Sequence, residues 1–388
     1  MDYDKLIAPA AQAMRPSGIR KFFDLAAEMP ECISLGVGEP DFKTPWAVRE
    51  AGIESLEHGR TRYTSNAGLK ELRAEICRYL DRRMGLHYDP AQVLVTVGGS
   101  EAIDMCIRTL IQPGDEVIIP EPCFVCYEPI TTLSGGVPVH VACRQEDEFR
   151  LRADALKAAI TPRTKLVIMP FPNNPTGAIY SLDILKDIVS VLEKKSREVG
   201  HPIWLLSDEP YRFLAYDGAV VPSVLPLYPY AVLLSSFSKN MSLPGERIGY
   251  AVPSPLLDRR DEFIAAITLT NRILGYVNAP IVGQHIMVAG LGSTVDSNIY
   301  LRRRNAMAEV LTEAGYEFTM PRGAFYFFPK APGGDDQAFI AELTKECVLG
   351  VPGSGFGCPG YFRLAFCVDE KVIRNAADGF AAARRKFA

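Results

Sequence analysis

The sequence predicts an α/β protein: a large domain with a mainly parallel sheet covered by helices on both faces, and a smaller α+β domain. Three observations support this. From about residue 90, short apolar runs alternate with amphipathic stretches, which is typical of a parallel sheet. After Pro280 the pattern changes, and long helical runs precede short strands. A chain of 388 residues is also too long to fold around one small hydrophobic core. We therefore predict a large domain over residues 46–280 and a small domain formed by residues 1–45 and 281–388.

The predicted strands of the large domain are short apolar runs. They are Val93–Val97, Glu116–Ile119, Val137–Val141, Lys165–Met169, Ile203–Ser207, Ala231–Ser235 and Ile248–Val252. Amphipathic spacing predicts helices over Glu101–Ile111, Ala153–Ile160 and Leu182–Arg197. In the small domain we expect helices over Ile281–Leu291 and Thr294–Ala314, strands over Ala324–Phe328 and Tyr361–Phe366, and a final helix from Asp369.

Composition excludes several classes of function. The net charge is −4 with both signs mixed, so neither a nucleic-acid footprint nor a basic membrane face is expected. No apolar stretch approaches a membrane span, and Met1–Lys5 lacks the pattern of a signal peptide, which predicts a cytoplasmic protein. The nine cysteines are expected to be reduced and mostly buried. Cys123 and Cys126 have CxxC spacing, but a lone pair favours a structural role, and we expect no metal site.

The residues best suited to chemistry follow apolar strands. Lys239 comes after the strand Ala231–Ser235, Ser236 and Ser238 stand beside it, and Arg247 follows eight residues later. A lysine amine can condense with an aldehyde, while hydroxyls and a guanidinium hold a phosphate. An isolated lysine is usually a surface residue, but this combination predicts a pyridoxal-phosphate site.

Asp208 ends the apolar run Trp204–Leu206, at the end of an expected central strand. A buried carboxylate needs a cationic partner, and a protonated pyridine nitrogen would supply one. Tyr211 could reach the phenolic oxygen of such a cofactor. An N-capping Asp208 and a partly buried core Tyr211 are the alternatives.

Two further turns could contribute to the same site. Gly98–Ser100 joins a strand to a helix, where free N–H groups suit a phosphate, although an ordinary tight turn is the favoured reading of this junction alone. Asn174 lies between prolines after the strand Lys165–Met169 and could present its amide to a ring oxygen. Alone, Asn-Pro more often indicates only a turn.

Taken together, these motifs resemble those of the class I/II aminotransferases, the pyridoxal-phosphate enzymes of the aspartate-aminotransferase fold. The resemblance runs from about Ser17 to the C-terminus. Its segments are Ser34–Phe42, Arg62-Tyr63, Asn174–Gly177, Asp208 with Tyr211, Ser236–Lys239, Arg247 and Tyr361–Arg363, all in the family's order and spacing.

The resemblance implies a role for each residue. Lys239 would bind the aldehyde and move the proton, Asp208 would pair with the ring nitrogen, and Asn174 and Tyr211 would contact the phenolic oxygen. The phosphate would be held by Gly99, Ser100, Ser236, Ser238 and Arg247, with Tyr63 crossing to the neighbouring subunit of a homodimer. Phe124 would stack on the ring. Arg363, helped by Gly38 and Asn174, would bind the substrate α-carboxylate.

The expected reaction moves the amino group of an L-amino acid to a 2-oxo acid, with 2-oxoglutarate as the expected acceptor. The alternatives are a C–S β-lyase on the same fold, which Tyr211 disfavours because lyases often carry His there, and a non-catalytic regulator. Ile19 and Ser100 occupy slots where dicarboxylate-selective relatives often have a hydroxyl residue and Lys, so a neutral or aromatic donor is expected. Glu246 replaces the Trp that many relatives have before the arginine, and we expect it to point away from the phosphate.

Overall fold

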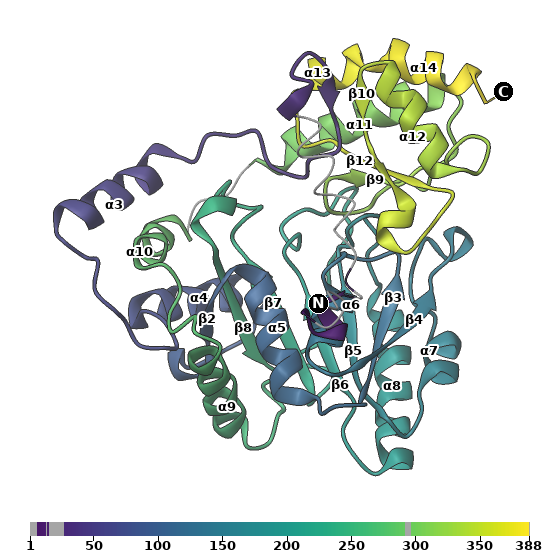
Figure 1. Ribbon diagram of the computed structural model, residues 1–388. Coiled ribbons are helices and arrows are strands. Elements are labelled where there is room, and N and C mark those ends of the chain that lie inside the picture. The colour runs from purple at the N-terminus through teal and green to yellow at the C-terminus, as the bar shows by residue number, and fades with distance from the viewer. Residues whose placement is uncertain (1–5, 13, 15–26, 292–295, 388) are drawn as a thin grey trace.

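The centre of the molecule is a seven-stranded sheet, seen in a computed structural model that describes residues 6–12, 14, 27–291 and 296–387 (Figure 1). The strand order is β2-β8-β7-β6-β5-β3-β4. Only β8 runs antiparallel to its neighbours, so the mainly parallel sheet predicted from the sequence is confirmed. The strands are β2 (Leu94–Val97), β3 (Glu116–Glu121), β4 (Val137–Ala142), β5 (Thr164–Pro170), β6 (Trp204–Asp208), β7 (Ala231–Ser236) and β8 (Ile248–Pro253).

Helices cover both faces of this sheet because its strands are apolar on both sides. In β5, Leu166 and Ile168 pack into one core cluster, and the alternating Val167 and Met169 pack into another. The first cluster is shared with α5 (Gly98–Leu110) and α9 (Arg260–Ile273), and the second with α4 (Lys70–Met84) and α8 (Leu182–Val199). The helices α6 (Tyr127–Leu133) and α7 (Ala153–Ala159) lie near β3 and β4.

A second group of elements lies above the sheet in Figure 1. Its strands form a three-stranded sheet, β11 (Val351–Pro352), β12 (Phe362–Ala365) and β9 (Tyr326–Phe327), and a pair, β1 (Ile33–Ser34) with β10 (Val348–Leu349). Its helices are α11 (Ser297–Glu313), α12 (Asp336–Lys345), α13 (Glu370–Asn375) and α14 (Ala377–Arg385). The single final helix expected from Asp369 is therefore two helices.

The N-terminal segment is attached to this second group. Ile33 pairs with Val348, and the guanidinium of Arg303 on α11 makes two hydrogen bonds of 2.8 Å to Asp41. Cys32 and Cys347 form a disulfide, so the expectation that all cysteines are reduced is wrong for this pair. The two residues precede paired strands, a proximity over 315 positions that the local sequence cannot indicate.

The helix α10 (Ile281–Gly290) packs against α3 (Trp46–Glu57), α4 and β8. It therefore lies beside the seven-stranded sheet, at the left of Figure 1. The domain limits drawn at residues 45 and 280 stay a prediction, and this packing would favour a boundary after α10. The remaining described helix, α1, covers Pro9–Gln12.

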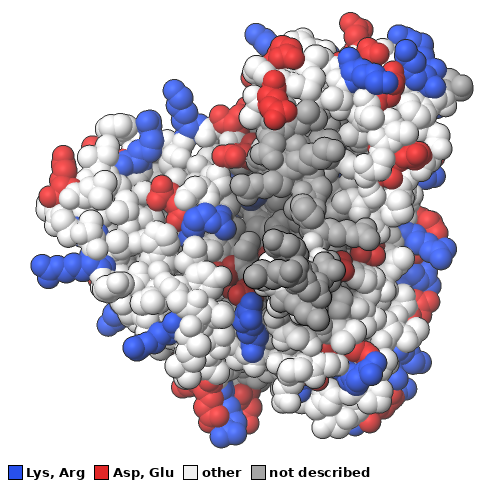
Figure 2. Space-filling view, viewed as in Figure 1, with Lys and Arg blue, Asp and Glu red and all other residues white. Residues whose placement is uncertain are grey.

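Charged side chains of both signs are interspersed over the face of the molecule shown in Figure 2. Among the described residues, no helix combines the length and the apolar character needed to cross a bilayer.

Candidate active site

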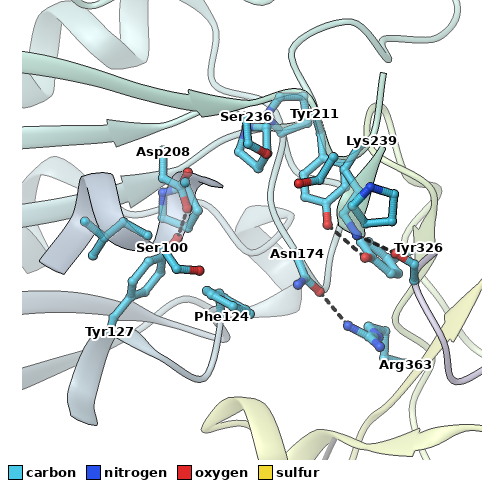
Figure 3. Close-up of a pocket in the computed structure, with 18 of the residues that line it drawn as sticks. Ser100, Phe124, Tyr127, Asn174, Asp208, Tyr211, Ser236, Lys239, Tyr326 and Arg363 are labelled. Atoms are coloured by element: carbon cyan, nitrogen blue, oxygen red, sulfur yellow. Dashed lines mark hydrogen bonds between the residues drawn. The ribbon is translucent and has the colours of Figure 1, made fainter. Parts of the chain in front are cut away.

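A cavity of about 310 Å³ lies at the edge of the sheet where the parallel strands end (Figure 3). Every predicted site residue except Tyr63 lines it. These are Gly38, Gly99, Ser100, Phe124, Asn174, Asp208, Tyr211, Ser236, Ser238, Lys239, Arg247 and Arg363. The structure therefore brings together residues from eight separate segments of the sequence.

Strand direction explains this convergence. Asp208 ends β6, Ser236 ends β7, and Asn174 follows β5, so all three lie at the carboxyl edge where α/β sheets bind ligands. Because β8 is antiparallel, its first end lies at the same edge, and Arg247 immediately precedes it. One reversed strand thus delivers a cation to the edge at which its neighbours end.

Asp208 is buried, and its pKa is raised to about 7 because burial disfavours the carboxylate. The Tyr127 hydroxyl donates a 2.6 Å hydrogen bond to Asp208 Oδ2 and opposes this rise. Within the described chain no cationic group pairs with Asp208. The site therefore contains a carboxylate that a cationic ligand would stabilise.

Other residues of the cavity suit an anion. Gly98 has φ +71°, and a Cβ there would lie 2.5 Å from Nη2 of Arg247, so the absence of a side chain lets the guanidinium approach the turn. Ser100 stands in the first turn of α5, where N–H groups are free of intrahelical partners. The hydroxyls of Ser236 and Ser238 line the same cavity.

Lys239 lines the same cavity. Its pKa is lowered, chiefly because burial disfavours the ammonium form. Its Nζ donates a 2.6 Å hydrogen bond to the carbonyl of Gly38. A partly buried amine with a lowered pKa is suited to nucleophilic attack on a carbonyl carbon.

Arg363, on β12, enters the cavity from the other side (Figure 3). The side chain is 3% exposed, and its Nη1 and Nη2 donate to Asn174 Oδ1 at 2.9 Å and to the carbonyl of Gly36 at 2.6 Å. Its buried Nε has no hydrogen-bond partner in the described structure. Both acceptors are neutral, so the charge remains available to an anionic ligand.

Two tyrosines that line the cavity were not predicted from the sequence. Tyr127 lies three residues after Phe124 and bonds Asp208, and Tyr326 lies 2.8 Å from Tyr211, hydroxyl to hydroxyl. Both are buried in apolar segments, where a tyrosine usually indicates core packing. The only signal in the sequence is that a buried tyrosine hydroxyl needs a hydrogen-bond partner. Because each partner is distant in sequence, the local sequence does not identify it.

Several other predicted residues lie elsewhere. Tyr63 is 88% exposed and does not line the cavity, and Glu246 does not line it either. Ile19 lies outside the described residues. Cys123 and Cys126 are both free thiols.

The sequence matches the family model described as aminotransferase class I and II over residues 30–380. The chain belongs to the class I and II aminotransferases. Members of this family are pyridoxal-phosphate enzymes, and the protein is an aminotransferase of this kind, as the resemblance predicted. The cavity fits the cofactor: Lys239 can meet the aldehyde, buried Asp208 a ring cation, and Arg247 with its serines a phosphate.

Similarity to individual proteins supports the same conclusion. The chain is 43% identical to a putative aminotransferase, YugH, of Bacillus subtilis, covering 94% of this chain and 95% of the relative. It is 35% identical to aromatic-amino-acid aminotransferase 2 of Thermococcus litoralis, covering 95% of both. An aminotransferase structure from Eubacterium rectale superposes with a TM-score of 0.92 at 34% identity, over 98% of this chain and 99% of that one. The β-lyase alternative is not favoured by these similarities.

Proposed function

We propose that this aminotransferase holds pyridoxal phosphate with the residues of the cavity and transfers the amino group of a neutral or aromatic L-amino acid to 2-oxoglutarate. The observation that supports this best is that Lys239 lines the same cavity as a buried carboxylate and an arginine with serines. When bound, the cofactor supplies an aldehyde that accepts the amino group and a ring that withdraws electrons. A cytoplasmic location stays a prediction.

Each of the following cavity residues has a defined role in this proposal. Asp208, once ionised, keeps a cation at the ring nitrogen, and Tyr127 holds the carboxylate in place. Arg247, Ser236 and Ser238, with Ser100 and the N–H groups of Gly99, bind the phosphate. Tyr211 and Asn174 donate hydrogen bonds to the phenolic oxygen. The ring of Phe124 stacks on the cofactor.

Substrate binding is assigned to Arg363, Asn174 and the backbone of Gly38. The Arg363 guanidinium binds the α-carboxylate by two parallel hydrogen bonds, which turns the Cα–H bond toward Lys239. Lys239, as the free amine, would be the base that takes the substrate's Cα proton and holds it, and the cofactor would supply the carbon to which the proton goes. Its lowered pKa favours the amine form that this step needs.

The preference for an uncharged side chain rests on the lining of the cavity. Its described cations are Lys239, Arg247 and Arg363, and each already has a partner in the proposal. A side-chain carboxylate would lack a cation there. The acceptor 2-oxoglutarate carries such a carboxylate, and the candidates to meet it are Arg20 and Lys21, outside the described residues, and the exposed Arg272.

We also propose a homodimer in which Tyr63 reaches the phosphate in the partner. The support is its 88% exposure together with exposed apolar side chains of α3 and α9, including Trp46, Leu56 and Ile273.

The test of function is a set of half-reactions. The pyridoxal-phosphate enzyme is mixed with phenylalanine, tyrosine, leucine, alanine or aspartate, and loss of the cofactor's visible absorbance is followed; 2-oxo acids are then added to restore it. We expect a neutral or aromatic donor to give the highest kcat/KM and 2-oxoglutarate to restore the absorbance. Aspartate outperforming all other donors would contradict the preference, and release of ammonia and pyruvate from cysteine would indicate a lyase.

A further inference from the structure

Tyr326 connects the parts of the cavity that are assigned to cofactor and to substrate. It lies on β9, and its side chain is buried. Its hydroxyl oxygen lies 2.8 Å from that of Tyr211, and its ring centroid lies 4.6 Å from the guanidinium carbon of Arg363. Figure 3 shows Tyr326 between these two side chains. From this geometry we infer that Tyr326 is a positioning residue that directs the Tyr211 hydroxyl proton toward the cofactor and holds the Arg363 guanidinium in plane.

The inference rests on the proposed function, in which Tyr211 donates to the phenolic oxygen of the cofactor. Only one proton can lie between two hydroxyl oxygens. If Tyr211 gives its proton to the cofactor, it must accept the proton of Tyr326. Within the described chain neither hydroxyl has another hydrogen-bond partner, so nothing competes for these protons. Burial raises the pKa of Tyr326 to about 12, which keeps its hydroxyl protonated and able to donate.

This arrangement should strengthen the donor that faces the cofactor. A hydroxyl that accepts one hydrogen bond becomes a better donor of the next, because each bond polarises its neighbour. A stronger donor at the phenolic oxygen favours its ionised form. Tyr326 therefore lowers the pH at which the bound cofactor loses a proton, although it would not touch the cofactor oxygen itself.

The ring of Tyr326 has a separate effect on Arg363. The guanidinium carbon lies 4.6 Å from the ring centroid of Tyr326 and 4.8 Å from the ring centroid of Phe356. The cation is therefore in contact with two aromatic rings. Such contacts attract a cation without using its N–H groups. The fork of Arg363 is thereby restrained in its plane while donors remain for a carboxylate.

The backbone near Tyr326 is shaped to admit its hydroxyl. A Cβ on Gly38 would lie 2.2 Å from the Tyr326 oxygen, so only glycine leaves room for it there. The carbonyl of the same Gly38 accepts the hydrogen bond of Lys239. The position of the Tyr326 hydroxyl is therefore restricted by two of the segments that form the site, those of Gly38 and Tyr211.

The decisive variant is Tyr326→Phe, which keeps the ring and removes only the hydroxyl. In the pyridoxal-phosphate enzyme without substrate, visible absorbance is titrated against pH. The midpoint should rise by about half to one pH unit, the worth of one neutral hydrogen bond. In a Tyr211→Phe background the same substitution should add no further shift, because the effect passes through Tyr211.

Tyr216→Phe is the matched control. Tyr216 is also buried, its hydroxyl donates to the carbonyl of Ala324 at 2.6 Å, and it does not line the cavity. Its loss should leave the midpoint unchanged. A complementary variant, Tyr326→Leu, removes the ring and should raise the KM for every amino acid about tenfold, whereas Tyr326→Phe should lower kcat with little change in KM.

Outcomes for Tyr326 and for the proposed function can be separated. A wild-type enzyme whose absorbance titrates, beside a Tyr326→Phe variant with the same midpoint, overturns the inference alone. An equal shift in the Tyr211→Phe background also overturns it. Failure of wild type to acquire the visible absorbance refutes the proposed function and the inference with it.

Discussion

Asp208→Asn should stabilise the cofactor-free protein while it abolishes function. Burial raises the Asp208 pKa from 3.8 to about 7. Ionising this carboxyl group therefore costs more free energy in the folded protein than in the unfolded chain, which lowers the stability of the folded state. A rise of about three pH units corresponds to about 4 kcal/mol once the group is fully charged. Asparagine can still accept the Tyr127 hydrogen bond but never ionises.

The sign of the effect follows from the two pKa values. Well below pH 3.8 Asp208 is protonated in both folded and unfolded states and costs nothing. The penalty grows as pH rises from 4 to 7 and is complete above the folded pKa. The stability advantage of Asp208→Asn over wild type should therefore widen by about 2–3 kcal/mol between pH 5 and pH 8.

Thermal unfolding of both cofactor-free proteins, at one-unit intervals from pH 5 to pH 8, measures this difference. For a chain of this size the predicted change corresponds to a melting temperature gap that widens by about 2–4 °C. Glu101, whose pKa is also raised to about 7 by burial, titrates in both proteins and cancels from the comparison. A gap that stays constant across this range would refute the reasoning, as would near-normal turnover in Asp208→Asn with the cofactor present.

Three further substitutions test other parts of the site. Arg363→Lys keeps the charge but loses the fork, so kcat/KM should fall about 100-fold or more for every amino acid while cofactor binding is retained; a loss limited to some side chains would contradict its role. Tyr127→Phe removes the bond that lowers the Asp208 pKa, so cofactor affinity at pH 7 should fall and recover at higher pH; unchanged affinity measured by equilibrium dialysis would argue against it. Tyr63→Phe should weaken cofactor binding, and light scattering should show that the protein is a dimer. A fully active monomer would exclude a site shared between two subunits.

The fold was largely predictable because local pattern and tertiary structure agree in the large domain. Each predicted strand lies within a residue or two of an observed one, since a strand buried on both faces must be apolar throughout. The short strands β1, β10 and β11 were not predicted. Their partners, Val348 and Arg363 among them, are fixed by long-range pairing that a two-residue run cannot show.

The candidate site was predictable to the extent that its residues follow strand ends in a known order. Lys239 and Asp208 are marked in this way, and Arg247 is marked by its position just before the strand β8. Tyr127 and Tyr326 are not, because each acts by bonding a residue far along the chain, Asp208 and Tyr211 respectively. From the sequence alone both are indistinguishable from core tyrosines.

The central claim is that Lys239 carries the cofactor, and chemical fixation tests it most directly. The yellow pyridoxal-phosphate enzyme is reduced with borohydride and digested, and the labelled peptide is sequenced by mass spectrometry. The label should lie on Lys239, and Lys239→Ala should bind the cofactor without becoming labelled. A label on another lysine in the wild-type enzyme, or a reducible covalent adduct in Lys239→Ala, would contradict the account.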